Sequence, residues 1–255
     1  MSSKQLSFLI ALAYQISFWQ LHAQELSLKI NTQTEINQAV VDDLGYADIF
    51  DEMAMLEAEV ERIKKQLYSI GYVELKLLKL TKNQLDYTAE LALGPQYNSV
   101  DIFGAIDAFE ALGFSPQIEA NTNLSFVRIP IKHLAYSLEQ LSKLLADESY
   151  AFATVRLDNI MSSGNKTLRA DLIINKGNKR SIQGVNVLGY EKFSRSFIKH
   201  FLGIKTQNPF SLERIKSKME LLDQLAFVRQ KRPAEVLFTP DTTTVYLYLE
   251  KIKSN

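Results

Sequence analysis

The sequence lacks cysteine entirely, has few histidines and carries no excess of either charge. Without cysteine the chain can form no disulfide, no thiolate metal site and no thiol nucleophile. The three histidines, His22, His133 and His200, are too scattered to indicate a histidine metal cluster. The 29 basic and 29 acidic side chains cancel, which argues against a nucleic-acid partner because phosphate binding favours a basic excess.

Common catalytic signatures are missing as well. The sequence contains no G-x-S-x-G serine elbow, no H-E-x-x-H zinc motif and no G-x-G-x-x-G nucleotide motif. The segment Gly164–Thr167 has the residues of a hairpin tip and lacks the upstream glycine of a phosphate-binding loop. We therefore predict no catalytic residue, no cofactor site and no metal site, and we expect that the protein is not an enzyme.

What is present is the composition of a folded protein, with 46% hydrophobic and 23% charged residues among 255. Residues 1–24 form a candidate signal peptide, in which Lys4 supplies the positive start and Leu6–Leu12 the apolar run. A membrane anchor is the alternative, but Gln15 and Gln20 interrupt a stretch that would need about 20 mainly apolar residues. We expect cleavage near Ala23 or Gln24 and export to a bacterial periplasm, since small eukaryotic secreted domains usually need disulfides.

Three amphipathic helices with one spacing are the most informative feature. Their apolar residues fall at i, i+4, i+7 and i+11, which predicts one buried stripe on each helix. The stripes are Leu56, Val60, Ile63 and Leu67; Leu134, Leu138, Leu141 and Leu145; and Ile215, Met219, Leu222 and Ala226. An aromatic residue follows each helix, and the three aromatics, Tyr72, Tyr150 and Phe227, are 78 and 77 residues apart. This period indicates an internal repeat.

Strand patterns surround each of these helices. Two alternating strands follow the aromatic residue, and an opening strand with a shorter helix precedes the main helix. The clearest short helix is Ser194–Leu202, ended by Gly203, whereas Gly45-Tyr46 either ends a short helix or lies in a loop. The predicted fold class is α+β, with three tandem β-α-α-β-β units, each a three-stranded sheet covered by two helices. The expected units are 25–95, 96–178 and 179–255, with breaks at Gly94-Pro95 and at 177–179.

At the level of this unit the chain resembles the polypeptide-transport-associated (POTRA) domains of outer-membrane assembly and translocation proteins, of the bacterial surface-antigen type. The resemblance rests on Gly71-Tyr72-Val73, on the stretch 150–155, on 185–190, on 202–211 and on the final strand 244–249. The second unit has Ser149-Tyr150, and the third Ala226-Phe227, where Gly-Tyr is typical. In this family a β-barrel follows such units, and its many alternating strands are not in this sequence.

The resemblance implies a function in binding polypeptides. It implies a protein of the periplasm, associated with the outer membrane, whose partners are unfolded outer-membrane or secreted clients and accessory assembly proteins. It also implies contact with the outer membrane through a barrel that is not part of this chain. The alternative is a periplasmic scaffold with POTRA-like domains that is not fused to a barrel, as in cell-division interaction proteins.

An open sheet edge is the expected binding surface, because its unpaired N–H and C=O groups can accept an added strand from many different clients. The resemblance places the second strand of each unit at the edge, here 73–80, 153–160 and 228–238. The partner-binding candidates are Val73, Leu75, Lys76, Leu77, Ala153, Val155, Arg156, Val228, Arg229 and Lys231. An equal alternative is that some charged residues of these strands guard the edge against aggregation; they are Lys76 and Lys79, or Arg229, Lys231 and Arg232 with Pro233.

The basic residues Lys176, Lys179 and Arg180 bracket the second junction. We interpret them as part of a solvated linker, with contact to acidic lipid or a partner as the alternative.

Overall fold

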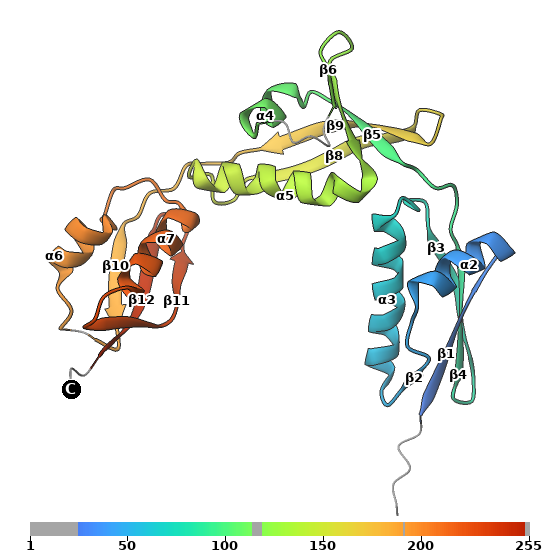
Figure 1. Cartoon of the computed structure of the whole chain (residues 1–255), viewed down its shortest axis with the longest axis horizontal. Coiled ribbons are helices and arrows are strands. Elements are labelled where there is room, and N and C mark those ends of the chain that lie inside the picture. Colours follow the sequence, from blue (N-terminus) through green and yellow to red (C-terminus); the bar gives the residue numbers. More distant parts are fainter. Residues whose placement is uncertain (1–24, 114–118, 191, 253–255) are drawn as a thin grey trace, which may run out of the picture. The chain divides into compact units, whose positions relative to one another are not determined.

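The computed structural model describes residues 25–113, 119–190 and 192–252. The predicted signal peptide lies outside these ranges, so its cleavage stays a prediction. The described chain forms three separate sheets, each accompanied by helices (Figure 1). By contacts it divides into two compact units, 1–98 and 99–255, and the second of these contains two of the three sheets. The three-unit boundaries at 95 and 178 therefore remain a prediction.

The first sheet has the strand order β2-β1-β4-β3. Its strands are β1 (Leu26–Thr32), β2 (Ile49–Phe50), β3 (Lys76–Asn83) and β4 (Asp86–Ala92), and its helices are α2 (Glu35–Leu44) and α3 (Met53–Ser69). All four residues of the predicted stripe on α3 are buried, and they pack with the inward residues of β1 and β4 in one core. Gly45 ends α2 with a φ of 63°, which settles the ambiguity over Gly45-Tyr46 in favour of a helix end.

The second sheet has five strands in the order β6-β7-β5-β9-β8. They are β5 (Ser99–Phe103), β6 (Glu119–Asn121), β7 (Phe126–Pro130), β8 (Thr154–Ser162) and β9 (Thr167–Asn175), with helices α4 (Ile106–Ala111) and α5 (Ile131–Asp147). Of the predicted α5 stripe, Leu141 and Leu145 are buried, whereas Leu134 and Leu138 are half-buried. Ile131 and Ser137 occupy the remaining buried positions, so the stripe is rotated relative to the prediction.

The third sheet has the order β10-β12-β11 and no further described strand. It comprises β10 (Gly184–Leu188), β11 (Val228–Phe238) and β12 (Thr243–Lys251), with α6 (Arg195–Phe197) continuing into the π-helix η1 (Ile198–Leu202) and α7 (Leu212–Asp223). Alternate residues of β12, among them Val245, Leu247 and Leu249, are fully buried under the helices. The stripe on α7 is confirmed except for Ala226, which is exposed because the helix already ends at Asp223.

The α+β class and the β-α-α-β-β unit are confirmed, with one difference in strand number. Only the third sheet has three described strands, because β2 adds to the first sheet and the β6–β7 hairpin adds to the second. The hairpin lies between α4 and α5, and its residues Val127 and Ile129 are fully buried. It is also tied to β5 by a two-pronged ion pair, in which Arg128 Nε and Nη2 lie 2.6 and 2.8 Å from the Asp101 carboxylate.

The first two main helices end in the same way despite different residues. Gly71 has a φ of 106° and Ser149 a φ of 80°, so both adopt a left-handed conformation that favours glycine. In each case the following aromatic donates its N–H to a carbonyl of the last helical turn, Tyr72 to Leu67 O and Tyr150 to Leu145 O, both at 3.0 Å. The serine therefore keeps the helix ending that glycine gives in the first unit.

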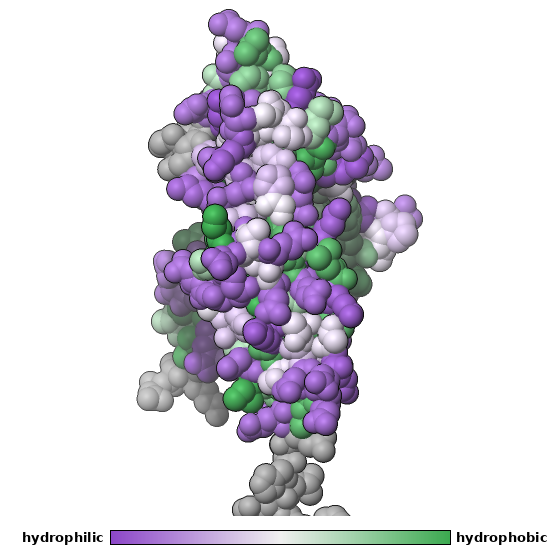
Figure 2. Space-filling model, turned by 90° about the vertical axis from the view of Figure 1, so that its right-hand side faces the viewer, coloured by the Kyte–Doolittle hydropathy of each residue, from purple (hydrophilic) through white to green (hydrophobic). Residues whose placement is uncertain are grey.

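No helix in the described part of the chain is long and apolar enough to cross a membrane. The face of the molecule drawn in Figure 2 is largely hydrophilic, and its hydrophobic residues form separate spots.

Candidate functional site

Each sheet ends in the strand that directly follows the main helix. These strands are β3, β8 and β11, and none of them has a described strand on its outer side. All three pair antiparallel with the last strand of their unit, so their outward backbone groups are available to another chain. Each also carries an exposed large apolar residue, namely Leu78 on β3, Ile160 on β8 and Leu237 on β11.

The first edge is open along most of β3. The hairpin turn at Gln84-Leu85 has two residues, with Asn83 opposite Asp86, and opposed residues in an antiparallel pair alternate between hydrogen-bonded and non-bonded positions. Counting from the turn, we infer that the N–H groups of Lys82 and Leu80 point away from β4. A register shift follows between Leu77 and Lys79 and displays Leu78 at the edge.

The second edge is interrupted near its middle. A register shift in β8 falls between Asp158 and Met161, and Asn159 takes a positive φ of 51° there. Ile160 and Met161 lie at the end of this irregularity that is nearer the hairpin turn, and both are exposed. Bulges of this kind limit flat edge-to-edge pairing, so the regular stretch of β8 before Asp158 is the better surface for strand addition.

The third edge is partly closed by the molecule itself. Ile252 donates its N–H to Phe227 O, so by alternation the N–H of Gln230 points outward from β12. That outward N–H is taken by the Asp223 carboxylate at 2.7 Å. Two register shifts follow on β11, between Gln230 and Arg232 and between Arg232 and Glu235.

Charged and aromatic side chains reinforce the middle of this edge. Arg232 lies over the ring of Tyr248 at 3.6 Å, and the Tyr248 hydroxyl donates to Glu235 at 2.7 Å. The hydrogen bond to the Glu235 carboxylate raises the pKa of Tyr248 above its ordinary value. β11 is thus the most protected of the three edges, and β3 the most open.

The ten predicted partner-binding residues do not all lie on these edges. Leu75 precedes β3, and Val228 is the first residue of β11; both side chains are buried in the cores and cannot reach a partner. Val73 and Ala153 precede their strands, because a turn comes first: Leu75 donates to Tyr72 O and Ala153 to Tyr150 O. The expected starts of the first two edge strands were therefore wrong by three residues and by one.

The remaining candidates lie on the edge strands. Lys76, Leu77, Arg156, Arg229 and Lys231 are exposed, and Val155 is half-buried. Arg156 and Arg229 form surface ion pairs with Asp158 and Glu250. Whether any of these residues contacts a partner stays a proposal.

Arg180 has a role that the sequence did not reveal. Its guanidinium lies between the rings of Phe152 and Phe238, 5.5 and 5.8 Å from their centroids. It also donates to the carbonyl oxygens of Thr239 and Pro240 in the turn between β11 and β12. The interpretation as solvated linker is therefore wrong for Arg180, which fastens the turn of the third sheet to the segment before β8. The only available signal was the basic cluster itself, since its aromatic partners are distant in sequence.

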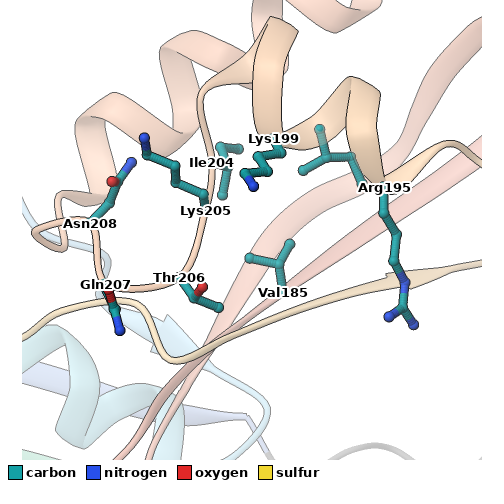
Figure 3. Close-up of a pocket in the computed structure, with 9 residues that line it drawn as sticks. Val185, Arg195, Lys199, Ile204, Lys205, Thr206, Gln207 and Asn208 are labelled. Carbon is teal, nitrogen blue, oxygen red and sulfur yellow. The ribbon is translucent and has the colours of Figure 1, made fainter.

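A pocket of about 670 Å³ lies beside the opposite edge of the third sheet, between β10 and the helix α6–η1. In Figure 3 the Val185 side chain and the Lys199 ammonium point toward this space, whereas Arg195 extends along its outer side. The loop that carries Lys205 closes the other end. Arg195, Lys199 and Lys205 line the pocket and make its lining basic, although only the Lys199 ammonium points into the space in Figure 3.

Within the described ranges, no group of three or more His, Asp or Glu side chains could hold a metal ion.

Comparison with known proteins gives matches among solved structures. A crystal structure of POTRA domains 3–5 of BamA from Haemophilus influenzae is 14% identical and has a TM-score of 0.56, over 89% of this chain and 96% of that chain. POTRA domains 1–3 of the periplasmic domain of Omp85 from Anabaena match over 89% of this chain and 95% of that chain, with 12% identity and a TM-score of 0.31. No protein-family model matches the sequence, and neither does any curated protein. The fold is that of consecutive POTRA domains, as the sequence predicted.

Proposed function

We propose that this chain is the periplasmic POTRA region of an outer-membrane protein assembly or translocation factor, and that it binds extended polypeptides by strand addition at its sheet edges. The observation that carries the proposal is the open outer side of β3, with outward N–H groups at Leu80 and Lys82 and exposed apolar side chains at Leu77 and Leu78. The shared fold with POTRA domains of BamA supports the assignment to this class of protein.

Strand addition accounts for a surface that must receive many sequences. Backbone hydrogen bonds hold an added strand with little regard to its side chains, and alternate side chains fall on either face. The exposed leucines on β3 would cover apolar residues of the client, while Lys76 and Lys79 keep the edge from pairing with a second copy of itself. No catalytic group is required for this function.

The test is photo-crosslinking of an extended outer-membrane client peptide to the full chain, with the crosslinks mapped to the first repeat. Lys82→Pro removes the outward N–H, whereas Lys82→Ala removes only the side chain. We expect crosslinks at β3 to fall with the proline and to persist with the alanine. Circular dichroism and thermal unfolding must match between the two variants, because only then does the difference report on the missing donor.

Equal crosslinking by both folded variants would contradict edge addition at β3. Crosslinks that move to the surface of α3 instead would favour binding between helix and sheet.

A further inference from the structure

The balanced charge of the whole chain hides a steep gradient between the three repeats. Residues 25–95 contain 7 basic and 13 acidic side chains, and residues 96–178 contain 7 and 9. Residues 179–255 contain 14 basic and only 7 acidic side chains, a net charge of +7. The third repeat is therefore a strongly basic module within a neutral protein, and it will attract anionic partners.

The first helix of each repeat shows the same difference in charge. The helices α2 and α4 carry only acidic charges, with Glu35, Asp42 and Asp43 on the one and Asp107 and Glu110 on the other. The equivalent helix α6–η1 carries only basic side chains, and no acidic residue occurs between positions 192 and 212. The basic residues of this stretch, Lys192, Arg195, Lys199, His200 and Lys205, are all exposed. No described carboxylate forms an ion pair with any of them.

An aromatic cluster lies on one flank of the same helix. It consists of Tyr190, Phe193, Phe197, Phe201 and Phe227. Phe197 stacks on Phe201 with ring centroids 4.5 Å apart and meets Phe227 edge-on at 5.9 Å. Phe193 is buried and anchors the cluster, but Phe201 and Phe227 expose 49% and 47% of their surface.

The other flank holds the cations. Arg195 and Lys199 are one turn apart and border the pocket beside β10, as Figure 3 shows. Val185 and Ile204 form an apolar wall in the same pocket. A short helix with phenylalanines on one flank and cations on the other can rest on a bilayer surface, with the rings at the acyl boundary and the cations among phosphates.

We propose that the helix α6–η1 of the third repeat docks on an anionic lipid bilayer. This inference goes beyond polypeptide binding at the sheet edges and uses a different element of the chain. An anionic lipid surface fits better than an acidic polypeptide because the exposed rings of Phe201 and Phe227 suit the acyl boundary of a bilayer. It fits better than nucleic acid because Phe197 and Phe193 already cover one face of Phe201 and Phe227, which leaves only the other face of each ring for a base.

The test places a single tryptophan at the predicted contact. Trp19 is the only tryptophan of the chain, so Trp19→Phe with Phe201→Trp leaves one emitter in the full-length protein. The matched control is Trp19→Phe with Tyr136→Trp, because Tyr136 is 64% exposed on α5 and lies outside the basic repeat. On vesicles containing phosphatidylglycerol, we expect emission from position 201 to shift to shorter wavelength and emission from position 136 to stay unchanged.

Charge reversal supplies the second measurement. Arg195→Glu with Lys199→Glu should raise the lipid concentration needed for the shift at position 201 at least about tenfold, because cations near an anionic surface strengthen membrane binding. Lys132→Glu with Lys166→Glu changes the net charge by the same amount in the second repeat and should leave the shift intact. Vesicles of phosphatidylcholine alone should give no shift.

Three outcomes would overturn the proposal. Equal shifts at 201 and 136 would mean that the protein associates without a specific face, for instance through residues 1–24. A shift at position 201 that survives charge reversal, or that appears on phosphatidylcholine, would show that binding does not depend on anionic lipid. An equal shift with soluble polyglutamate would show that the partner of this helix is an acidic polypeptide and not a bilayer.

Discussion

The first and third repeats have one topology and opposite surfaces. In both, the opening strand runs parallel to the last strand and the edge strand runs antiparallel to it. The first repeat nevertheless carries a net charge of −6, and the third carries +7. The outer side of β1 is covered by β2, while the outer side of β10 has no described strand. Conversely β3 is open, and β11 is capped by Asp223.

Under the two proposals above, the first and third repeats would have different functions. The buried positions are constrained by the common core, so they fix strand order and helix placement in both. The exposed edges and helix faces are free to differ. The first repeat has an open β3 edge and a covered β1 edge, whereas the third has a partly closed β11 edge and an open β10 edge. We therefore propose polypeptide binding chiefly at the β3 edge and lipid contact at the α6–η1 face.

The largest expected effect concerns how the main helix ends in the two repeats. Gly71→Ala should destabilise the first repeat by about 3 kcal/mol, because it adds a Cβ 2.0 Å from Tyr97 O and strains a φ of 106°. The equivalent residue of the third repeat is Ala226, which is exposed and does not have a positive φ. Ala226→Gly should cost only about 0.5 kcal/mol. Urea unfolding, monitored by hydrogen exchange of the core amides of each repeat, measures the loss of stability in both variants. Similar losses for Gly71→Ala and Ala226→Gly would contradict this prediction.

A smaller effect is expected from opening the third edge. Asp223→Ala removes the acceptor of the outward Gln230 N–H, a hydrogen bond to a charged group worth about 1.5 kcal/mol. The Gln230 amide should exchange roughly tenfold faster, and client crosslinks at β11 should rise toward the level at β3. Unchanged exchange at Gln230 would show that Asp223 does not close this edge.

The smallest effect is a pH dependence confined to the first repeat. Glu59 accepts hydrogen bonds from Arg62 and from the Ala47 N–H, and the bond from Arg62 is the main reason that its pKa lies below the ordinary value. A carboxylate with a lowered pKa stabilises the folded state above its unfolded pKa and loses that contribution as the pH falls. Glu59→Gln should therefore lower the stability of the first repeat by about 1 kcal/mol at pH 7 and by less near pH 3. Equal losses at both pH values would contradict this origin.

The sequence was a good guide to the core and a poor guide to the edges. Period-two alternation placed β4, β9 and β12 correctly, because every second side chain is buried along β4 and β12 and in the first half of β9. The hairpin β6–β7 was missed because Arg128 interrupts its short second strand, which runs into the helix at Ile131 without a loop, so Pro130 indicated only the start of the helix. The starts of β3 and β8 were missed because a turn after Tyr72 and Tyr150 has no glycine or proline to mark it.

The roles of surface residues such as Asp223 and Arg180 depend on contacts within the fold that no local sequence pattern identifies. Asp223 and Gln230 are seven residues apart, and nothing in their spacing shows that a carboxylate closes a strand edge. Arg180 meets Phe152 and Phe238 only because the fold brings them together. The charge of the third repeat, by contrast, can be counted from the sequence with the predicted repeat boundaries.

The most direct test of the central claim is amide hydrogen exchange of the full chain with and without a saturating extended client peptide. Strand addition predicts slower exchange at the outward amides of β3, Leu80 and Lys82, with little change at the inward amide of Thr81. It predicts weaker protection at Gln230 on the closed third edge. Protection that is absent from β3, or that appears on the exposed side of α3 instead, would contradict the account.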